Sequence, residues 1–209
     1  QNPTKLSGEG EQDTYQTLQK GSLAVDSSGF STKRYETWFT IRKGRGKRKS
    51  YLKLHIIIAL STLTILKARI TKGSRHDSPM LKDLLKGIEK GEGILCADSA
   101  YLSRKNCNLI AGKGRAPYVK PKKNSRMKAK GSQAWRSMIK LYREDRKMFD
   151  RHYHQRSLVE SVYSVLKTVF GNHLTSRRRK TQKRELMCRV VAYNIDRTNL
   201  IAIQEDMAK

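Results

Sequence analysis

Two short apolar segments, far apart in the chain, each end in an aspartate. Residues 22–25 lead to Asp26, where small polar residues break the run, and residues 94–97 lead to Asp98. Short apolar runs bounded in this way are typical of buried β-strands. Carboxylates that end neighbouring strands would lie together, so the sequence predicts an acidic site built from these two aspartates.

A helical segment, residues 153–167, carries a third acidic side chain on a polar stripe. At about 100° per residue, four side chains fall within about 60° of one another around this helix; they are Tyr153, Arg156, Glu160 and Lys167. The opposite side is apolar and is expected to face the core; its residues are Leu158, Val162, Val165, Leu166 and Val169. The same spacing also allows a plain solvated face with an Arg156–Glu160 ion pair, worth about 0.2–0.5 kcal/mol.

The elements that must position these residues follow from the patterning of the chain. Further strands are predicted at residues 35–41, 51–59, 63–71 and 116–119, and helices at 80–90, 105–111, 133–171 (as one helix or two) and from about 180 to 200. Asp77 is the main rival for the acidic site, but the following Ser78-Pro79 favours a helix-capping role. This order of elements predicts a mixed sheet flanked by helices.

The charge of the chain points to a polyanionic partner. Lys and Arg number 45 against 18 Asp and Glu, which gives a formal net charge of +27. Such a charge destabilises the fold by self-repulsion, and binding to nucleic acid neutralises it. No apolar run approaches the roughly 20 residues of a membrane span, and no signal peptide is visible. A cytoplasmic protein without a membrane partner is therefore expected. Its three scattered cysteines are expected to be free thiols rather than disulfide or zinc ligands.

The polar stripe also has the spacing of a known signature. Tyr153-x₂-Arg156-x₃-Glu160-x₆-Lys167 matches at every position the YREK motif of DDE insertion-sequence transposases, which this chain resembles. The segments around Asp26 and Asp98 are similar to the strands that bear the first and second aspartates of that family. The resemblance covers about residues 20–200. It implies an α/β, RNase H-like fold with a five-stranded mixed sheet flanked by helices.

The resemblance also implies a domain organisation. The catalytic domain is expected over residues 21–203, after a polar lead-in or linker remnant at 1–20 and before a tail at 204–209. No helix-turn-helix pattern precedes Asp26, so a domain that recognises terminal repeats is expected to be missing, or the copy to be an inactive or truncated remnant. The short span between Asp98 and Glu160 predicts a compact variant without a large β-rich insertion.

Three carboxylates carry the implied chemistry. The resemblance assigns Asp26, Asp98 and Glu160 as catalytic and metal-binding, with Asp26 as the bridging ligand. Two Mg²⁺ ions, with Mn²⁺ as a substitute, would stabilise charge on the attacking and leaving oxygens of a phosphodiester. Hard cations prefer oxygen ligands, and a bound cation relieves the repulsion among clustered carboxylates. The implied enzyme is a DNA transposase that cleaves at element ends and transfers the freed 3′-hydroxyl into target DNA.

Contacts with double-stranded DNA are implied as well. Arg156 and Lys167 would hold phosphates beside the cut, and Tyr153 would position or stack on the terminal DNA. Basic loops at 43–49 and 120–130 and a basic stretch at 177–180 are expected to contact the DNA backbone; the residues assigned there are Lys47, Arg48, Lys122, Lys123, Arg177 and Arg178. Family members act as dimers on paired ends, so a homodimer on DNA is expected, beside the nucleoid of a prokaryotic host.

Two other functions stay open from the sequence. A non-catalytic, basic nucleic-acid-binding protein would carry the carboxylates incidentally, and Mg²⁺-dependent nicking that is lost in Asp98→Asn would argue against it. An RNase H-like nuclease without strand transfer would share the same metal site. Only a strand-transfer assay with a pre-cleaved DNA end separates that nuclease from a transposase.

Overall fold

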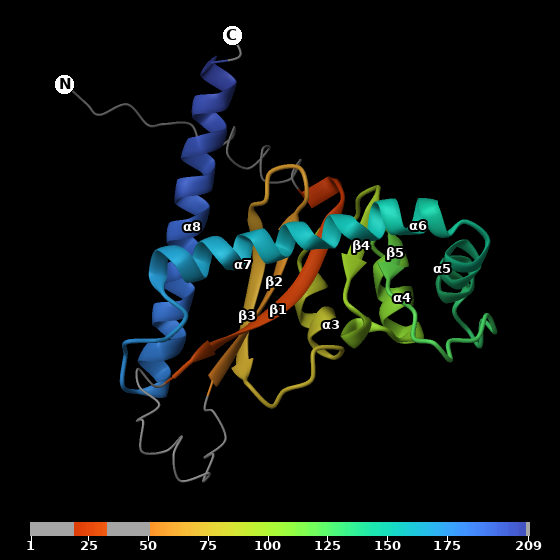
Figure 1. Cartoon of the computed structure of the whole chain (residues 1–209), viewed down its shortest axis with the longest axis horizontal. Helices are drawn as coiled ribbons and strands as arrows, with labels where there is room; N and C mark the ends of the chain where they lie inside the picture. Colours follow the sequence, from red (N-terminus) through yellow and green to blue (C-terminus); the bar gives the residue numbers. More distant parts are fainter. Residues whose placement is uncertain (1–18, 33–50, 208–209) are drawn as a thin grey trace.

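The computed structural model describes residues 19–32 and 51–207, and within these ranges the strands form a five-stranded sheet (Figure 1). The strands are β1 (Leu23–Ser31), β2 (Tyr51–Ala59), β3 (Ile65–Lys72), β4 (Ile94–Ala97) and β5 (Ala116–Val119). Their order is β3-β2-β1-β4-β5. The pairs β1–β2 and β2–β3 are antiparallel, whereas β1–β4 and β4–β5 are parallel. The sheet is therefore mixed, as predicted; the strand predicted at 35–41 lies outside the described residues.

The central strand β1 is longer than the sequence predicts. It does not end at Asp26 but continues through Ser27, Ser28 and Gly29 to Ser31. The predicted break is wrong because β2 pairs with β1 along its whole length, from Leu23↔Ala59 to Ser31↔Tyr51. A partner strand satisfies the backbone of these small polar residues, which otherwise favour a turn.

The helix that follows β3 is shorter than predicted, and its start differs too. Helix α3 spans Met80–Leu85, because Lys86 adopts an extended backbone and Gly87 has a φ of 83°. The residue at its N-terminus is Pro79, and no side chain caps it. The predicted capping role of Asp77 is therefore wrong, and its carboxylate instead accepts hydrogen bonds from side chains of β1 and β2.

The helical stretch predicted at 133–171 is divided at two points. It contains α5 (Gln133–Glu144), α6 (Arg146–Tyr153), a 3₁₀ turn (His154–Arg156) and α7 (Ser157–Phe170). Asp145 separates α5 from α6, and its side chain accepts a hydrogen bond from the Met148 N–H (2.9 Å). The short helix α4 (Arg104–Ala111) packs against α5 and β5. Helix α7 crosses the sheet over β1, and α6 lies over β4 and β5 (Figure 1).

The buried face of α7 differs in part from the predicted one. Val162 and Leu166 are buried as expected, but Val165 and Val169 are 41% and 65% exposed. Val159 and Tyr163 are buried in their place. Helical periodicity sets the width of the apolar stripe, but the contact with β1 decides which residues lie at its centre.

Helix α8 (Arg179–Met207) packs against β3 and contacts α7. It continues past the predicted end near residue 200, so the predicted tail at 204–209 is helical up to Met207. Figure 1 shows its C-terminal part extending beyond the sheet. Neither α8 nor any other helix in the described ranges is long and apolar enough to cross a membrane.

Two paired side chains of α8, Arg189 and Glu185, hold this helix to the loop that follows α7 through hydrogen bonds to its backbone. Arg189 is 7% exposed, and it donates hydrogen bonds to the carbonyl oxygens of Gly171 and His173 and to Glu185 Oε1 (2.6 Å). The Glu185 carboxylate also accepts from the N–H groups of Thr175 and Ser176 (3.0 and 2.8 Å). Burial alone would raise the pKa of Glu185, but these hydrogen bonds lower it from 4.5 to about 2.

We expect Glu185→Gln to destabilise the protein at neutral pH but not in strong acid. The folded-state pKa lies below the unfolded one, so the stabilisation is complete above pH 4.5 and is lost as the pH falls toward 2. The free energies of unfolding of the two proteins in urea should differ by about 1–3 kcal/mol at pH 7 and converge near pH 2. A difference that does not change with pH would contradict this role of the charge.

Candidate active site

The register of the sheet places Asp26 beside Asp98. The last pair of the parallel β1–β4 ladder is Val25↔Ala97, and the two aspartates are the next residues on their strands. Asp98 is half-buried, and its side chain does not cap the 3₁₀ turn Ser99–Tyr101 that follows it. Two carboxylates separated by 72 positions in the chain therefore meet where β4 ends and β1 continues.

The electrostatics of Asp26 connect it with both other acidic residues. Burial raises its pKa most strongly, while the N–H of Ser27 and the charge of Arg156 lower it. The charges of Asp98 and Glu160 raise the pKa further, so that the overall shift is upward. A carboxylate whose pKa is raised by two neighbouring negative charges lies at a position that attracts cations.

Arg156 links Asp26 to Glu160. Its Nη1 donates to Asp26 Oδ2 (2.8 Å), and its Nη2 donates to Glu160 Oε1 (2.6 Å). The Asp26 side chain is 18% exposed and that of Glu160 is 58% exposed. The i,i+4 pair expected on a solvated helix face is thus present, but the same guanidinium also reaches across to β1. Arg156 therefore joins β1 to α7 in addition to pairing within its own helical segment.

A small open cavity of about 290 Å³ lies beside these carboxylates. Its lining comes from β1 and α7 and consists of Asp26, Ser27, Ser28, Glu160, Tyr163, Ser164 and Lys167. Lys167 Nζ donates to Ser28 Oγ (2.7 Å), so its ammonium group lies on the β1 side of α7. Asp98 lies outside this lining, on the β4 side of Asp26. The cavity combines two carboxylates with a cation, which suits a phosphate group accompanied by a metal ion.

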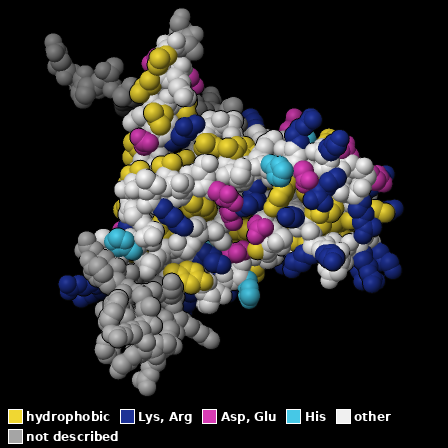
Figure 2. Space-filling model, in the orientation of Figure 1, with side chains coloured by type: hydrophobic (Ala, Val, Ile, Leu, Met, Phe, Trp, Pro, Cys, Tyr) yellow, Lys and Arg dark blue, Asp and Glu magenta, His cyan; other side chains and the backbone are white. Residues whose placement is uncertain are grey.

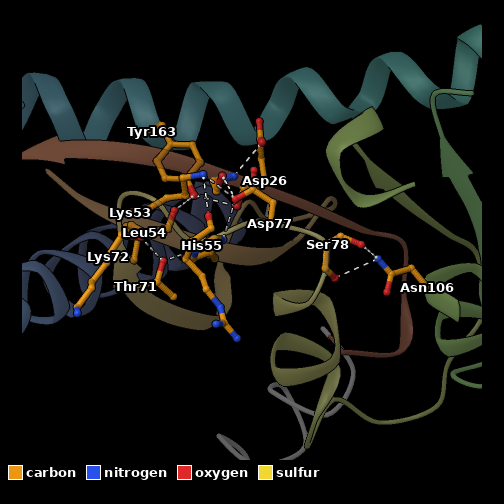
Figure 3. A network of polar contacts seen from close by, with 12 residues as sticks. Asp26, Lys53, Leu54, His55, Thr71, Lys72, Asp77, Ser78, Asn106 and Tyr163 are labelled. Atoms are coloured by element: carbon orange, nitrogen blue, oxygen red, sulfur yellow. Dashed lines mark hydrogen bonds and ion pairs between the residues drawn. The ribbon is translucent and has the colours of Figure 1, made fainter. Parts of the chain in front are cut away.

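Tyr163 supports this site, and the sequence patterning did not single it out. Its side chain points from α7 to the sheet (Figure 3), where its hydroxyl lies 3.0 Å from the carbonyl oxygen of Asp26 and 2.8 Å from that of Leu54. The hydroxyl has one proton, so it donates to one of these oxygens at a time. A tyrosine within an apolar helical face was the available signal, because a buried phenol needs a partner for its hydroxyl.

Tyr153 does not lie on the exposed stripe with the other motif residues. It ends α6, and the 3₁₀ turn His154–Arg156 separates it from α7. Its ring is 9% exposed and stacks on Phe149, with centroids 5.9 Å apart. The prediction of one continuous helix with four aligned side chains is therefore wrong at this position. The proposed contact of Tyr153 with terminal DNA stays a prediction.

The donor set fits a hard divalent cation. All three side chains offer carboxylate oxygens, which Mg²⁺ prefers, and Mg²⁺ is usually held by only one or two carboxylates together with water and substrate phosphates. Within residues 19–32 and 51–207, no three acidic, histidine or cysteine side chains already converge as ligands of one ion. The guanidinium of Arg156 lies between Asp26 and Glu160 and occupies one oxygen of each carboxylate.

Comparison with known families decides the relationship. The family model described as "Transposase DDE domain" matches residues 18–195 of this chain. The chain belongs to the transposase DDE domain family. The matched range contains Asp26, Asp98 and Glu160, and the RNase H-like fold class predicted for it is confirmed. Membership in the YREK subgroup stays a prediction. No solved structure matches the chain.

The basic loop of this transposase domain between β5 and α5 is held in place by its neighbours. Arg104 of α4 donates to the carbonyl oxygens of Lys128 and Ala129 (3.1 and 3.2 Å), and its guanidinium lies 4.7 Å from the Trp135 ring. Trp135 Nε1 in turn donates to the carbonyl oxygen of Arg126 (2.9 Å). The backbone of this loop is therefore fixed, while its cationic side chains remain exposed.

The surface around this loop is strongly cationic. A groove of about 470 Å³ between the loop and α5 has only cations as charged lining residues, namely Arg126, Lys128, Arg136 and Arg143. A second hollow, of about 350 Å³, includes Lys122 of the predicted set. Figure 2 shows Lys and Arg side chains gathered at the end of the molecule that contains α5, while acidic side chains gather near the middle of the same face.

The other residues predicted to contact DNA lie in different parts of the chain. Lys123 is exposed on the same loop as Lys122. Arg177 and Arg178 are exposed between α7 and α8. Lys47 and Arg48 lie outside the described residues. Sequence reasoning did not single out Arg104, Arg136 and Arg143, because they lie in two helices, α4 and α5, and come together with the basic loop only after folding.

Proposed function

We propose that this transposase domain cleaves phosphodiester bonds at the ends of a mobile DNA element and transfers the freed 3′-hydroxyl into target DNA. The observation that carries this proposal is the meeting of Asp26 and Asp98 in the parallel register of β1 and β4, with Glu160 joined to Asp26 through Arg156. The family of the chain supports the transposition reaction.

Each charged group of the site has a part in this chemistry. Asp26, Asp98 and Glu160 would hold Mg²⁺ or Mn²⁺. Such ions stabilise the charge on the attacking and leaving oxygens of the phosphodiester. Lys167, which lines the cavity from α7, would hold the phosphate beside the cut. Arg156 would exchange one of its two carboxylate contacts for a phosphate, which its planar guanidinium can bind through two N–H groups.

The proposal includes the setting of the reaction. Two element ends must be brought together for transfer, so we propose a homodimer on double-stranded DNA. The substrate would be chromosomal DNA, which places the protein in the cytoplasm beside the nucleoid of a prokaryotic host.

Purified protein provides the test. We expect it to nick supercoiled plasmid DNA only when Mg²⁺ or Mn²⁺ is added, and to join a duplex with a free 3′-hydroxyl to a second plasmid. The duplexes are taken from the DNA that flanks the coding sequence. Nicking without joining would indicate a nuclease, and DNA binding without either reaction would contradict the catalytic proposal.

The basic loop between β5 and α5 is expected to contribute to the affinity for DNA rather than to catalysis. Replacing Lys122 and Lys123 by Gln should reduce the slope of log affinity against log salt concentration by about 1.8, which corresponds to about 0.9 for each lost phosphate contact. Equilibrium binding of a short duplex measured across a salt series gives the slope. Lys82→Gln with Lys86→Gln is the matched control, because both residues are exposed around α3. An equal change in both double variants would show that only net charge matters.

A further inference from the structure

Asp77 lies just before α3, and its side chain reaches β1 and β2. Ser27 Oγ and Lys53 Nζ each donate to Asp77 Oδ1 at 3.0 Å, and His55 Nδ1 lies 3.5 Å from the same oxygen. Ser27 and His55 are partners in the antiparallel β1–β2 ladder, and Lys53 is two residues from His55. All three therefore project from the same face of the sheet, and Figure 3 shows Asp77 gathered with Lys53 and His55 next to Asp26.

Ser27 connects this cluster to the catalytic carboxylate. Its hydroxyl donates to Asp77, while its backbone N–H donates to Asp26 Oδ1 (2.8 Å). The other oxygen of Asp26, Oδ2, accepts from Arg156. The two carboxylate oxygens of Asp26 are thus held by groups of two different elements. Asp77 acts on one of these groups from the opposite face of β1.

The surroundings of Asp77 suit an anchor between the segment before α3 and the sheet. Its side chain is 17% exposed, and Lys53, at 18%, supplies a compensating positive charge. His55 is fully buried, with Nε2 2.9 Å from Thr71 Oγ1. Ser27, Lys53 and His55 all contact the same carboxylate oxygen, Oδ1, from two strands of the sheet. The same contacts tie the segment before α3 rigidly to two strands.

The buried phenol of Tyr101 shows how near this cluster is to the catalytic groups. Its ring is fully buried, and burial raises its pKa first, followed by the negative charges of Asp77 and Asp26 and also that of Asp98. One side chain is therefore within electrostatic reach of Asp77 and of both catalytic aspartates. Asp77 belongs to the surroundings of the active site rather than to the end of α3.

We propose that Asp77 is a positioning residue that holds Asp26 in its catalytic orientation through Ser27. This inference rests on the proposed function, since it assumes that Asp26 binds the metal. Removing Asp77 frees the Ser27 hydroxyl and leaves Lys53 without its carboxylate, so that this part of β1 loses its anchor on that face. A displacement of about 1 Å in a catalytic group can lower a rate by about 100-fold.

The test compares variants in the Mg²⁺-dependent nicking assay. We expect Asp77→Ala to lower kcat by about 100-fold and to raise the half-saturating Mg²⁺ concentration, with unchanged affinity for the DNA duplex. Asp77→Asn should lose less, because its amide oxygen can still accept from Ser27 Oγ. Asp83→Asn is the control for charge, because Asp83 is exposed within α3. Partial unfolding would lower the number of active molecules but would leave their half-saturating Mg²⁺ concentration unchanged.

A second variant keeps the proposal testable if Asp77→Ala does not fold. Ser27→Ala preserves the Asp77–Lys53 pair and removes only the link to Asp26. It should reproduce the lower kcat and the higher Mg²⁺ requirement with a melting temperature close to that of the wild type. Wild-type values of both in folded Ser27→Ala would overturn the positioning role. Asp26→Asn is measured in parallel, because full activity of that variant would overturn the proposed function itself.

Discussion

Replacing Asp98 by Asn is expected to lower Mg²⁺-dependent DNA nicking by about 1,000-fold, which corresponds to a loss of about 4 kcal/mol of transition-state stabilisation. The amide keeps the shape of the side chain but loses the negative charge that a divalent ion needs. Asp98 is half-buried at the end of β4, and its side chain makes no capping hydrogen bond to the 3₁₀ turn that follows. Its replacement should therefore change the free energy of unfolding by no more than about 0.5 kcal/mol.

Nicking rates and thermal unfolding of the same preparation separate the two effects. Asp196→Asn, an exposed substitution on α8, is the matched control and should cleave at the wild-type rate. If Asp98→Asn also cleaved at that rate, the three-carboxylate site would be wrong. If instead no divalent ion supported cleavage by the wild type, the non-catalytic DNA-binding alternative would account for the protein.

Arg156→Gln should change metal binding and cleavage in opposite directions. In the wild type the guanidinium contacts both Asp26 and Glu160, and its charge lowers the pKa of Asp26. Without it, both carboxylates are available to a divalent ion, so Mn²⁺ should bind more tightly in a calorimetric titration. Cleavage at saturating metal should still fall by about 100-fold, because a fixed cation that stabilises the transferring phosphate is lost.

Arg146→Gln is the control for this prediction. Arg146 makes an i,i+4 pair with Asp150 at 2.7 Å, but its side chain is 49% exposed and contacts no residue of the site. It should change neither metal affinity nor rate. Weaker Mn²⁺ binding in Arg156→Gln would contradict competition between the arginine and the metal. Wild-type cleavage in that variant would contradict its role at the phosphate.

Local patterns in the sequence identified the acidic residues that the structure brings into proximity. The short apolar runs before Asp26 and Asp98 predicted buried strands, because a strand covered on both faces needs apolar side chains on both. The spacing from Arg156 to Glu160 allowed their ion pair, because residues four apart are neighbours on a helix. These features depend on chemistry within a few residues, which is why they could be inferred without a fold.

Features that depend on contacts between distant segments could not be predicted in this way. The continuation of β1 past Asp26 needs β2 as a partner. The 3₁₀ turn that buries Tyr153 and the choice of Tyr163 over Val165 as a core residue of α7 depend on packing against the sheet. Asp77 has a sequence context typical of a helix cap, yet side chains of two strands engage its carboxylate.

For this transposase domain, the order and type of its residues were enough to indicate a mixed sheet, a DNA-binding charge and three candidate carboxylates. Only the tertiary structure decided which groups surround those carboxylates: Arg156 between Asp26 and Glu160, and Ser27 with Asp77 on the other face of β1. The physical reason is that hydrogen bonds and ion pairs act over a few ångströms in space. The sequence separations of 50 and 130 residues that these contacts span are closed only by the pairing of strands and the packing of α7.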